Sequence, residues 1–122
     1  MTGNEYVKLA MRTNDGLCGH RLREGIIFNP MLGDALNGAL GLAGEAGETL
    51  DMIKKWIFHG AELDKVHLEK ELGDVMWYMA MLCNAFGFSL DEVMQLNIDK
   101  LKARYPDGFS EAASNNRRAG DV

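Results

Sequence analysis

Apolar residues recur at the spacing of an amphipathic helix over four stretches of the chain. The stretches are residues 5–12, 33–58, 65–86 and 90–104. The second stretch ends at His59 and Gly60, where a glycine can adopt the left-handed conformation that closes a helix. Asp64 and Ser89 precede the third and fourth stretches, and both residue types are good helix N-caps. The pattern therefore predicts four helices.

Two segments lack this periodicity. Residues 14–34 contain four glycines and one proline, which interrupt any long pattern. We expect an irregular segment there, in which residues 22–28 form either a helical turn or a short strand. After residue 110 the side chains become small and polar, so residues 111–122 are predicted to form a mobile C-terminal tail behind a single domain of residues 1–110.

The composition narrows the class of protein. A chain of 122 residues with 47% hydrophobic side chains forms one globular domain with a modest core. The net charge of −5 disfavours a nucleic-acid polymer as partner, because a phosphate backbone requires a basic surface. No apolar run reaches the roughly 18 residues that a membrane span needs. Two cysteines, Cys18 and Cys83, and the lack of a secretory segment predict a cytoplasmic protein.

The candidate chemistry lies in two acidic pairs, Glu45-x-x-Glu48 and Glu71-x-x-Asp74. Residues three apart share a helix face, and like charges there repel unless a cation compensates. Each pair lies about ten residues, or about 15 Å, from the turn between the two central helices. The pairs therefore face each other if these helices pack antiparallel. Carboxylates without cysteine are hard oxygen ligands, which favours Mg²⁺ or Mn²⁺.

The surroundings of these pairs favour a site over a solvated helix face, which is the usual role of a single acidic pair. Gly41 and Gly44 lie on the face of Glu45, although each glycine costs a helix roughly 1 kcal/mol. They predict the close approach of a ligand or another helix. Residues 75–82 are apolar on every side and are therefore predicted to be buried. His67 shares the face of Glu71, where it is either a ligand, a neighbour of the ligands or a residue of the helix start.

These residues also carry a family resemblance. The motifs are ALGLAGEAGE at 39–48, IKKWIFHG at 53–60, KELGDVMWY at 70–78 and NIDKLKARYPDGF at 97–109. Over about residues 32–110 the chain resembles the MazG-like all-α nucleoside triphosphate pyrophosphohydrolases. The resemblance implies an all-α, antiparallel four-helix-bundle-like fold that is completed by a homodimer or homotetramer. Many members carry a further glutamate where this chain has Gly44, so the general base and the number of metals stay open.

The resemblance also implies an activity and roles for residues. The expected reaction is Mg²⁺- or Mn²⁺-dependent cleavage of a nucleoside triphosphate between its α and β phosphates, which gives a monophosphate and pyrophosphate. The expected metal ligands are Glu45, Glu48, Glu71 and Asp74. Glu48 is also the first candidate for the general base, and Lys55, two turns along the same face, could reach phosphate oxygens. The expected substrate-binding residues are Lys54 and, on one face of the last helix, Asn97, Lys100 and Arg104.

Base recognition is expected in residues 14–34 together with the first helix, because side chains of residues 14–34 can match the donors and acceptors of one base. The candidates are Asn14, Asp15, His20, Arg21, Arg23 and Asn29. We favour a purine deoxynucleotide such as dGTP, with dUTP, dCTP or a broad range of nucleotides as alternatives. A triphosphatase and a non-catalytic helical binding or dimerisation module are the rival functions.

Overall fold

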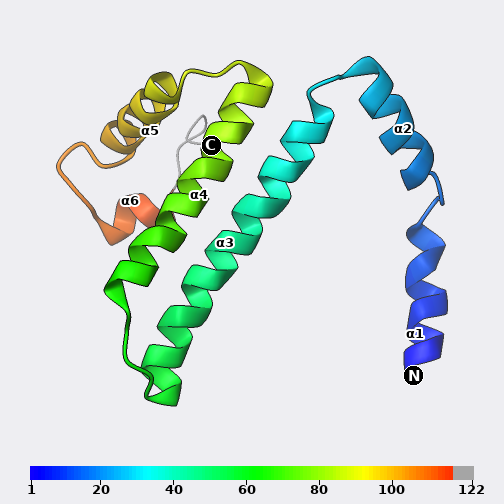
Figure 1. Cartoon of the computed structure of the whole chain (residues 1–122), viewed down its shortest axis with the longest axis horizontal. Coiled ribbons are helices and arrows are strands. Elements are labelled where there is room, and N and C mark those ends of the chain that lie inside the picture. The colour runs from blue at the N-terminus through cyan, green and yellow to red at the C-terminus, as the bar shows by residue number, and fades with distance from the viewer. Residues whose placement is uncertain (117–122) are drawn as a thin grey trace.

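The computed structural model describes residues 1–116, and all the regular structure in this range is helical (Figure 1). The elements are α1 (Gly3–Ala10), the 3-10 helix η1 (Met11–Thr13), α2 (Cys18–Phe28), α3 (Leu32–His59), α4 (Lys65–Phe86), α5 (Leu90–Arg104) and α6 (Glu111–Asn115). The predicted all-α class is confirmed. Within the described range, no helix is both long enough and apolar enough to span a membrane.

The ends of the long helices follow the predicted capping residues. Gly60 adopts φ 68°, and this left-handed conformation ends α3. Asp64 starts α4 by accepting a hydrogen bond from the backbone N–H of His67 at 3.0 Å. Ser89 starts α5 in the same way through the N–H of Glu92 at 3.4 Å. Helices α4 and α5 consequently occupy the predicted ranges.

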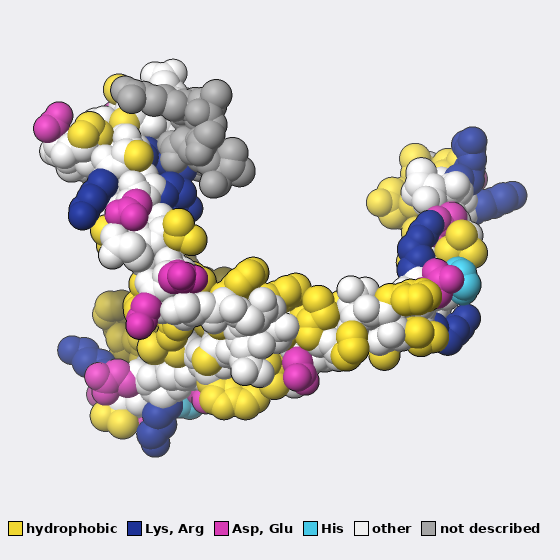
Figure 2. Space-filling view, turned by 90° about the horizontal axis from the view of Figure 1, so that it is seen from above, with side chains coloured by type: hydrophobic (Ala, Val, Ile, Leu, Met, Phe, Trp, Pro, Cys, Tyr) yellow, Lys and Arg dark blue, Asp and Glu magenta, His cyan; other side chains and the backbone are white. Residues whose placement is uncertain are grey.

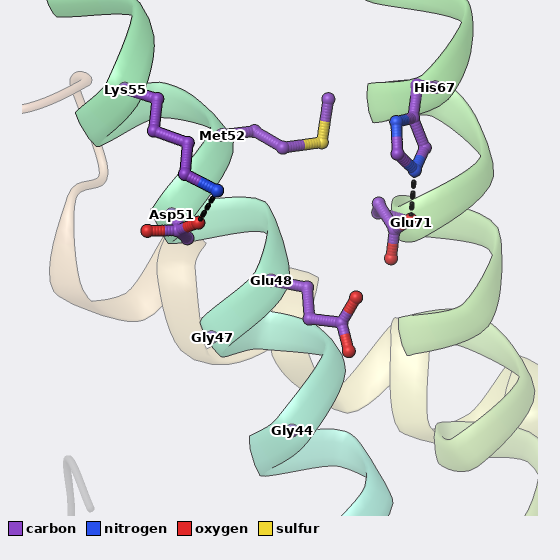
Figure 3. Close-up of a pocket in the computed structure, with 8 residues that line it drawn as sticks. All are labelled: Gly44, Gly47, Glu48, Asp51, Met52, Lys55, His67 and Glu71. Atoms are coloured by element: carbon purple, nitrogen blue, oxygen red, sulfur yellow. Dashed lines mark ion pairs between the residues drawn. The ribbon is translucent and has the colours of Figure 1, made fainter. Parts of the chain in front are cut away.

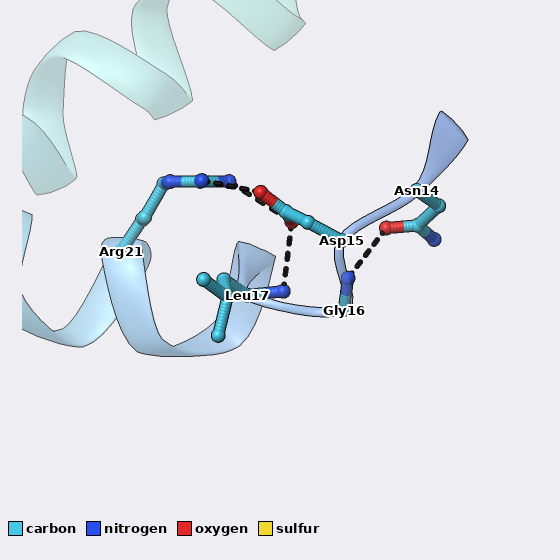
Figure 4. Close-up of polar contacts among 5 residues, drawn as sticks. All are labelled: Asn14, Asp15, Gly16, Leu17 and Arg21. Carbon is cyan, nitrogen blue, oxygen red and sulfur yellow. Dashed lines mark hydrogen bonds and ion pairs between the residues drawn. The ribbon is translucent and has the colours of Figure 1, made fainter. Parts of the chain in front are cut away.

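The prediction of an irregular segment is wrong for Cys18–Phe28, which form α2, although the helical alternative for residues 22–28 is confirmed. The glycine at position 25 does not break this helix, and a Cβ there would meet only the end of the Leu32 side chain, 2.7 Å from Cδ2. The preceding loop is organised by Asp15, which accepts from the N–H of Leu17 and pairs with Arg21 (Figure 4). Part of the expected tail is also ordered as α6, whereas residues 117–122 lie outside the described range.

Helices α3 and α4 form an antiparallel hairpin, which is the only extensive packing among the described residues (Figure 1). Two glycines of α3 let α4 come close. A Cβ at Gly38 would lie 2.9 Å from Leu82 Cγ, and a Cβ at Gly41 would overlap the ring of Tyr78. The unexpected glycine at position 41 is therefore explained by a neighbouring helix and not by a ligand.

Little apolar surface is buried within one chain. Among the described residues only Ala35, Gly38 and Glu71 are buried. The prediction that residues 75–82 are buried on every side is wrong for the single chain, where Trp77 is 57% exposed. The reason is that α4 packs on α3 with one face only. The arm formed by α1 and α2 projects away from the hairpin (Figure 1). In Figure 2 the two ends of the molecule project to the same side, and apolar side chains run along the surface between them.

Candidate metal site and active site

Three of the four predicted ligands converge between α3 and α4. One carboxylate oxygen each of Glu45, Glu71 and Asp74 lie within 4.8 Å of one another. The convergence follows from the close helix contact one turn away, because Glu45 is four residues after Gly41 and Asp74 is four before Tyr78. Oxygen atoms at this spacing could surround one divalent cation, and an all-carboxylate donor set fits Mg²⁺ or Mn²⁺.

Glu48 faces a neighbouring pocket and is not one of these three (Figure 3). The pocket has a volume of about 390 Å³ and shares Glu71 with the acidic cluster. Its lining residues are Gly44, Gly47, Glu48, Asp51, Met52, Lys55, His67 and Glu71. Nothing lies within 4 Å of the Cβ position of Gly44, so this glycine leaves open space beside the carboxylates.

The acidic residues repel one another in the absence of a cation. The pKa of Glu45 is raised, first by desolvation and then by the charges of Glu48, Asp74 and Glu71 and a hydrogen bond with Glu71. Both desolvation and like charges disfavour the ionised carboxylate. A bound cation would remove this repulsion, which supports the fit of a metal to the cluster.

Glu71 is the buried member of the cluster, and its partner is His67. The Nε2 atom of His67 lies 2.7 Å from Oε1 of Glu71 (Figure 3). The two residues are one helical turn apart in α4, and the Glu71 side chain is only 10% exposed. Of the three alternatives for His67, the structure places it beside the predicted ligand Glu71 and also in the first turn of α4.

The two predicted phosphate-binding lysines share one carboxylate that sequence reasoning missed. Asp51 pairs with Lys54 and, at 2.6 Å, with Lys55. Hydrogen bonds from Lys54 and Lys55 lower the pKa of Asp51 to about 2, and Asp51 in turn raises the pKa of Lys55. The spacing of three and four residues could have revealed these pairs. Lys55 lines the pocket, whereas Lys54 does not.

The comparison with known proteins agrees with this geometry. The family model of the MazG nucleotide pyrophosphohydrolase domain matches residues 35–109, which is more than half of the chain. The chain belongs to the MazG nucleotide pyrophosphohydrolase family. It is also 38% identical over 82 residues to the Gene 37 protein of Mycobacterium phage L5, a match that covers 64% of this chain and 72% of the phage protein. No solved structure matches the chain.

Membership of the MazG family implies nucleotide pyrophosphohydrolase activity and a nucleotide substrate. Proteins of this family are typically metal-dependent, in agreement with the acidic cluster. The matched range contains both acidic pairs, Asp51 and all of α5.

Helix α5 of the MazG domain does not reach the pocket of its own chain. It lies on the side of α4 away from α3 (Figure 1), and none of the expected substrate-binding residues on it lines the pocket. These residues are Asn97, Lys100 and Arg104. The structure does not bring these three residues to the pocket within one chain.

The expected base-recognition residues also lie apart from the pocket, in the arm formed by α1 and α2 (Figure 1). Several of them contact one another or near neighbours. Asn14 accepts from the N–H of Gly16 at 3.0 Å (Figure 4), Arg21 pairs with Asp15, and His20 lies 3.3 Å from Glu24. Within one chain these side chains organise the arm itself.

Proposed function

We propose that this MazG protein is a Mg²⁺-dependent hydrolase, also served by Mn²⁺, that cleaves nucleoside triphosphates between the α and β phosphates. The products are a nucleoside monophosphate and pyrophosphate. The observation that carries the proposal is the convergence of Glu45, Glu71 and Asp74 beside a pocket that also holds Lys55. The match to the MazG domain supports the reaction class.

In this proposal Glu45, Glu71 and Asp74 hold the metal, and Glu48 either completes the ligand set or acts as the general base. A divalent cation supplies charge neutralisation for the phosphates and acidifies a bound water. As base, Glu48 would accept a proton from the attacking water while the water oxygen bonds to one of the two bridged phosphorus atoms. The bond from that phosphorus to the α–β bridging oxygen breaks, and this oxygen leaves with the other phosphate product. Its position in the wall of the pocket, across from Glu71, supports this role (Figure 3).

Lys55 is the proposed cation for the phosphate oxygens. Its Nζ is held by Asp51 at the pocket, so the ammonium group is oriented before a nucleotide arrives. Lys54 shares Asp51 and adds positive charge at the same end of the site.

We infer that the site is completed by a second copy, in a homodimer or homotetramer. The support is the exposed apolar surface of the hairpin and the arm, including Leu40 at 72% and Phe28 at 77% exposure. Monomeric proteins rarely expose apolar surface on this scale. A second copy would cover it and would bring Asn97, Lys100 and Arg104 of its α5 to the carboxylates. Light scattering on purified protein tests this inference, and a monomer at micromolar concentration would contradict it.

Substrate preference is assigned to the arm of the second copy, since the arm lies apart from the pocket of its own chain (Figure 1). We favour a purine deoxynucleotide such as dGTP. The alternatives are dUTP, dCTP and a broad range of nucleotides. The polar groups of the arm, among them Asn14, Arg23 and Asn29, support base recognition because an unmatched base would leave them unpaired.

A nucleotide screen with product analysis tests the function. Each of the standard deoxynucleoside and ribonucleoside triphosphates is incubated with Mg²⁺, and the products are separated by ion exchange. Equal amounts of monophosphate and pyrophosphate are expected. A diphosphate with orthophosphate would indicate a triphosphatase. Absence of turnover together with absence of Mn²⁺ binding would indicate a non-catalytic helical module.

A further inference from the structure

We propose that His67 is a positioning residue that holds the buried Glu71 carboxylate in place for the metal. The inference rests on the proposed metal site and adds a residue to it. The observation is the 2.7 Å contact between His67 Nε2 and Glu71 Oε1 in the wall of the pocket (Figure 3).

The geometry leaves part of the carboxylate for the cation. A carboxylate has two oxygens and about four acceptor positions, and His67 uses one of them. In Figure 3 the second oxygen of Glu71 points away from the imidazole ring. Glu71 also offers an oxygen within 4.8 Å of the ligand oxygens of Glu45 and Asp74. A single contact with the imidazole can therefore orient Glu71 and still leave the metal site open.

His67 is itself held by the start of α4. Its backbone N–H donates to Asp64 Oδ1 at 3.0 Å, so the residue lies in a capped first turn. The imidazole reaches Glu71 one turn further along the same helix. The cap therefore fixes the backbone of His67, and the imidazole, which is 56% exposed, is placed by its contact with Glu71.

The chain contains a second histidine–glutamate pair of the same spacing, which lies on the surface and serves as a comparison. His20 and Glu24 have the same spacing in α2, but Nε2 and Oε1 are 3.3 Å apart and both side chains are more than half exposed. Such solvated pairs contribute little. Glu71, in contrast, is 10% exposed, and a carboxylate that is removed from water requires partners. His67 is the basic side chain that meets this requirement before the metal binds.

The test is a calorimetric Mn²⁺ titration, without nucleotide and at one pH, of the intact protein and of His67→Ala, His67→Gln and His20→Ala. Hydrogen-bonding neighbours of metal ligands typically contribute about 10–100-fold to metal affinity. We expect a loss of this size for His67→Ala, partial recovery for His67→Gln because its amide can donate, and no change for His20→Ala. Saturating Mn²⁺ should restore most of the kcat of His67→Ala.

Several outcomes would overturn the inference. Equal Mn²⁺ affinity of His67→Ala and the intact protein would show that the contact does not position Glu71. Tighter binding would show that His67 competes with the metal. If His67→Ala does not fold, His67→Met takes its place, because methionine keeps the bulk of the side chain without a hydrogen-bond donor. Equal Mn²⁺ affinities of His67→Met and His67→Gln would count against the proposal. The Mn²⁺ titration contains no nucleotide and so does not depend on hydrolysis. If the intact protein binds Mn²⁺ but hydrolyses no nucleotide, that result contradicts the proposed function and not the role of His67.

Discussion

The contact between Gly41 and Tyr78 should be essential to the α3–α4 hairpin, and two matched alanine substitutions test this. In Gly41→Ala the new methyl group would overlap the Tyr78 ring. Gly44→Ala lies one turn along the same helix, where nothing is within 4 Å of the new methyl group. Both substitutions replace a glycine inside α3.

The magnitudes follow from two opposing terms. Each alanine gains about 1 kcal/mol of helix propensity. Gly41→Ala must in addition move the Tyr78 ring or separate the helices, and such overpacking typically costs about 1–3 kcal/mol. Gly44→Ala should therefore stabilise the fold by up to about 1 kcal/mol. The two variants should differ by about 1–3 kcal/mol, which is roughly 4–12 °C in Tm at about 4 °C per kcal/mol for a chain of this size.

Thermal and urea unfolding measure this difference, at one protomer concentration because the Tm of an oligomer depends on concentration. The contact also sets the separation of Glu45 and Asp74, each one turn away. Gly41→Ala should consequently bind Mn²⁺ more weakly than the intact protein. Equal stability of the two alanine variants would refute the explanation of Gly41.

The remaining predictions concern charge and assembly. The pKa of Glu45 is raised, so its ionisation destabilises the metal-free fold as pH rises above about 4.5. In thermal melts with chelator, Glu45→Gln should reduce this loss of stability. The same variant should lose the stabilisation that Mn²⁺ gives the intact protein. Asp51 has a pKa lowered from 3.8 to about 2, so its ion pairs stabilise the fold above pH 3.8 and are lost as pH falls toward 2. Asp51→Asn should weaken the dependence of Tm on pH between pH 3.8 and 2. An unchanged dependence would contradict the pairing of Asp51 with Lys54 and Lys55. We expect no activity from Lys100→Ala alone or from Glu71→Gln alone, but partial activity after the two variants are refolded together. In a mixed oligomer, one site would combine the intact Glu71 of one chain with the intact Lys100 of the other. No recovery of activity would count against a site shared between chains.

The local structure of the long helices could be predicted from the sequence because capping residues mark their ends. Gly60, Asp64 and Ser89 gave boundaries that the structure confirms. Three of the four carboxylates meet as predicted, since both acidic pairs are equally far from one turn, whereas Glu48 faces the pocket. The full length of α2 could not be predicted because glycine usually interrupts a helical pattern, whereas Gly25 lies inside this helix without breaking it.

Features that depend on the neighbour of a residue could not be predicted from one sequence. Gly41 is explained only by Tyr78, 37 positions later in the chain. Residues 75–82 look uniformly apolar, yet only the face toward α3 is covered within one chain. The position of α5 relative to the carboxylates does not follow from its own sequence pattern, because among the described residues α5 makes no extensive contact with α3 or α4. Asp51, by contrast, could have been found from its spacing to Lys54 and Lys55.

The most direct test of the central claim is the rate of pyrophosphate release from dGTP and the other triphosphates as Mg²⁺ is titrated, for the intact protein and for Glu71→Gln. This substitution removes the charge of one proposed ligand at nearly constant volume, and circular dichroism checks that the helices persist. We expect the turnover of the intact protein to saturate as Mg²⁺ is added. For Glu71→Gln we expect turnover to fall at least about 100-fold, which corresponds to about 2.7 kcal/mol in activation free energy. Undiminished turnover in Glu71→Gln, or turnover by the intact protein that persists in chelator, would contradict a metal site built on Glu45, Glu71 and Asp74.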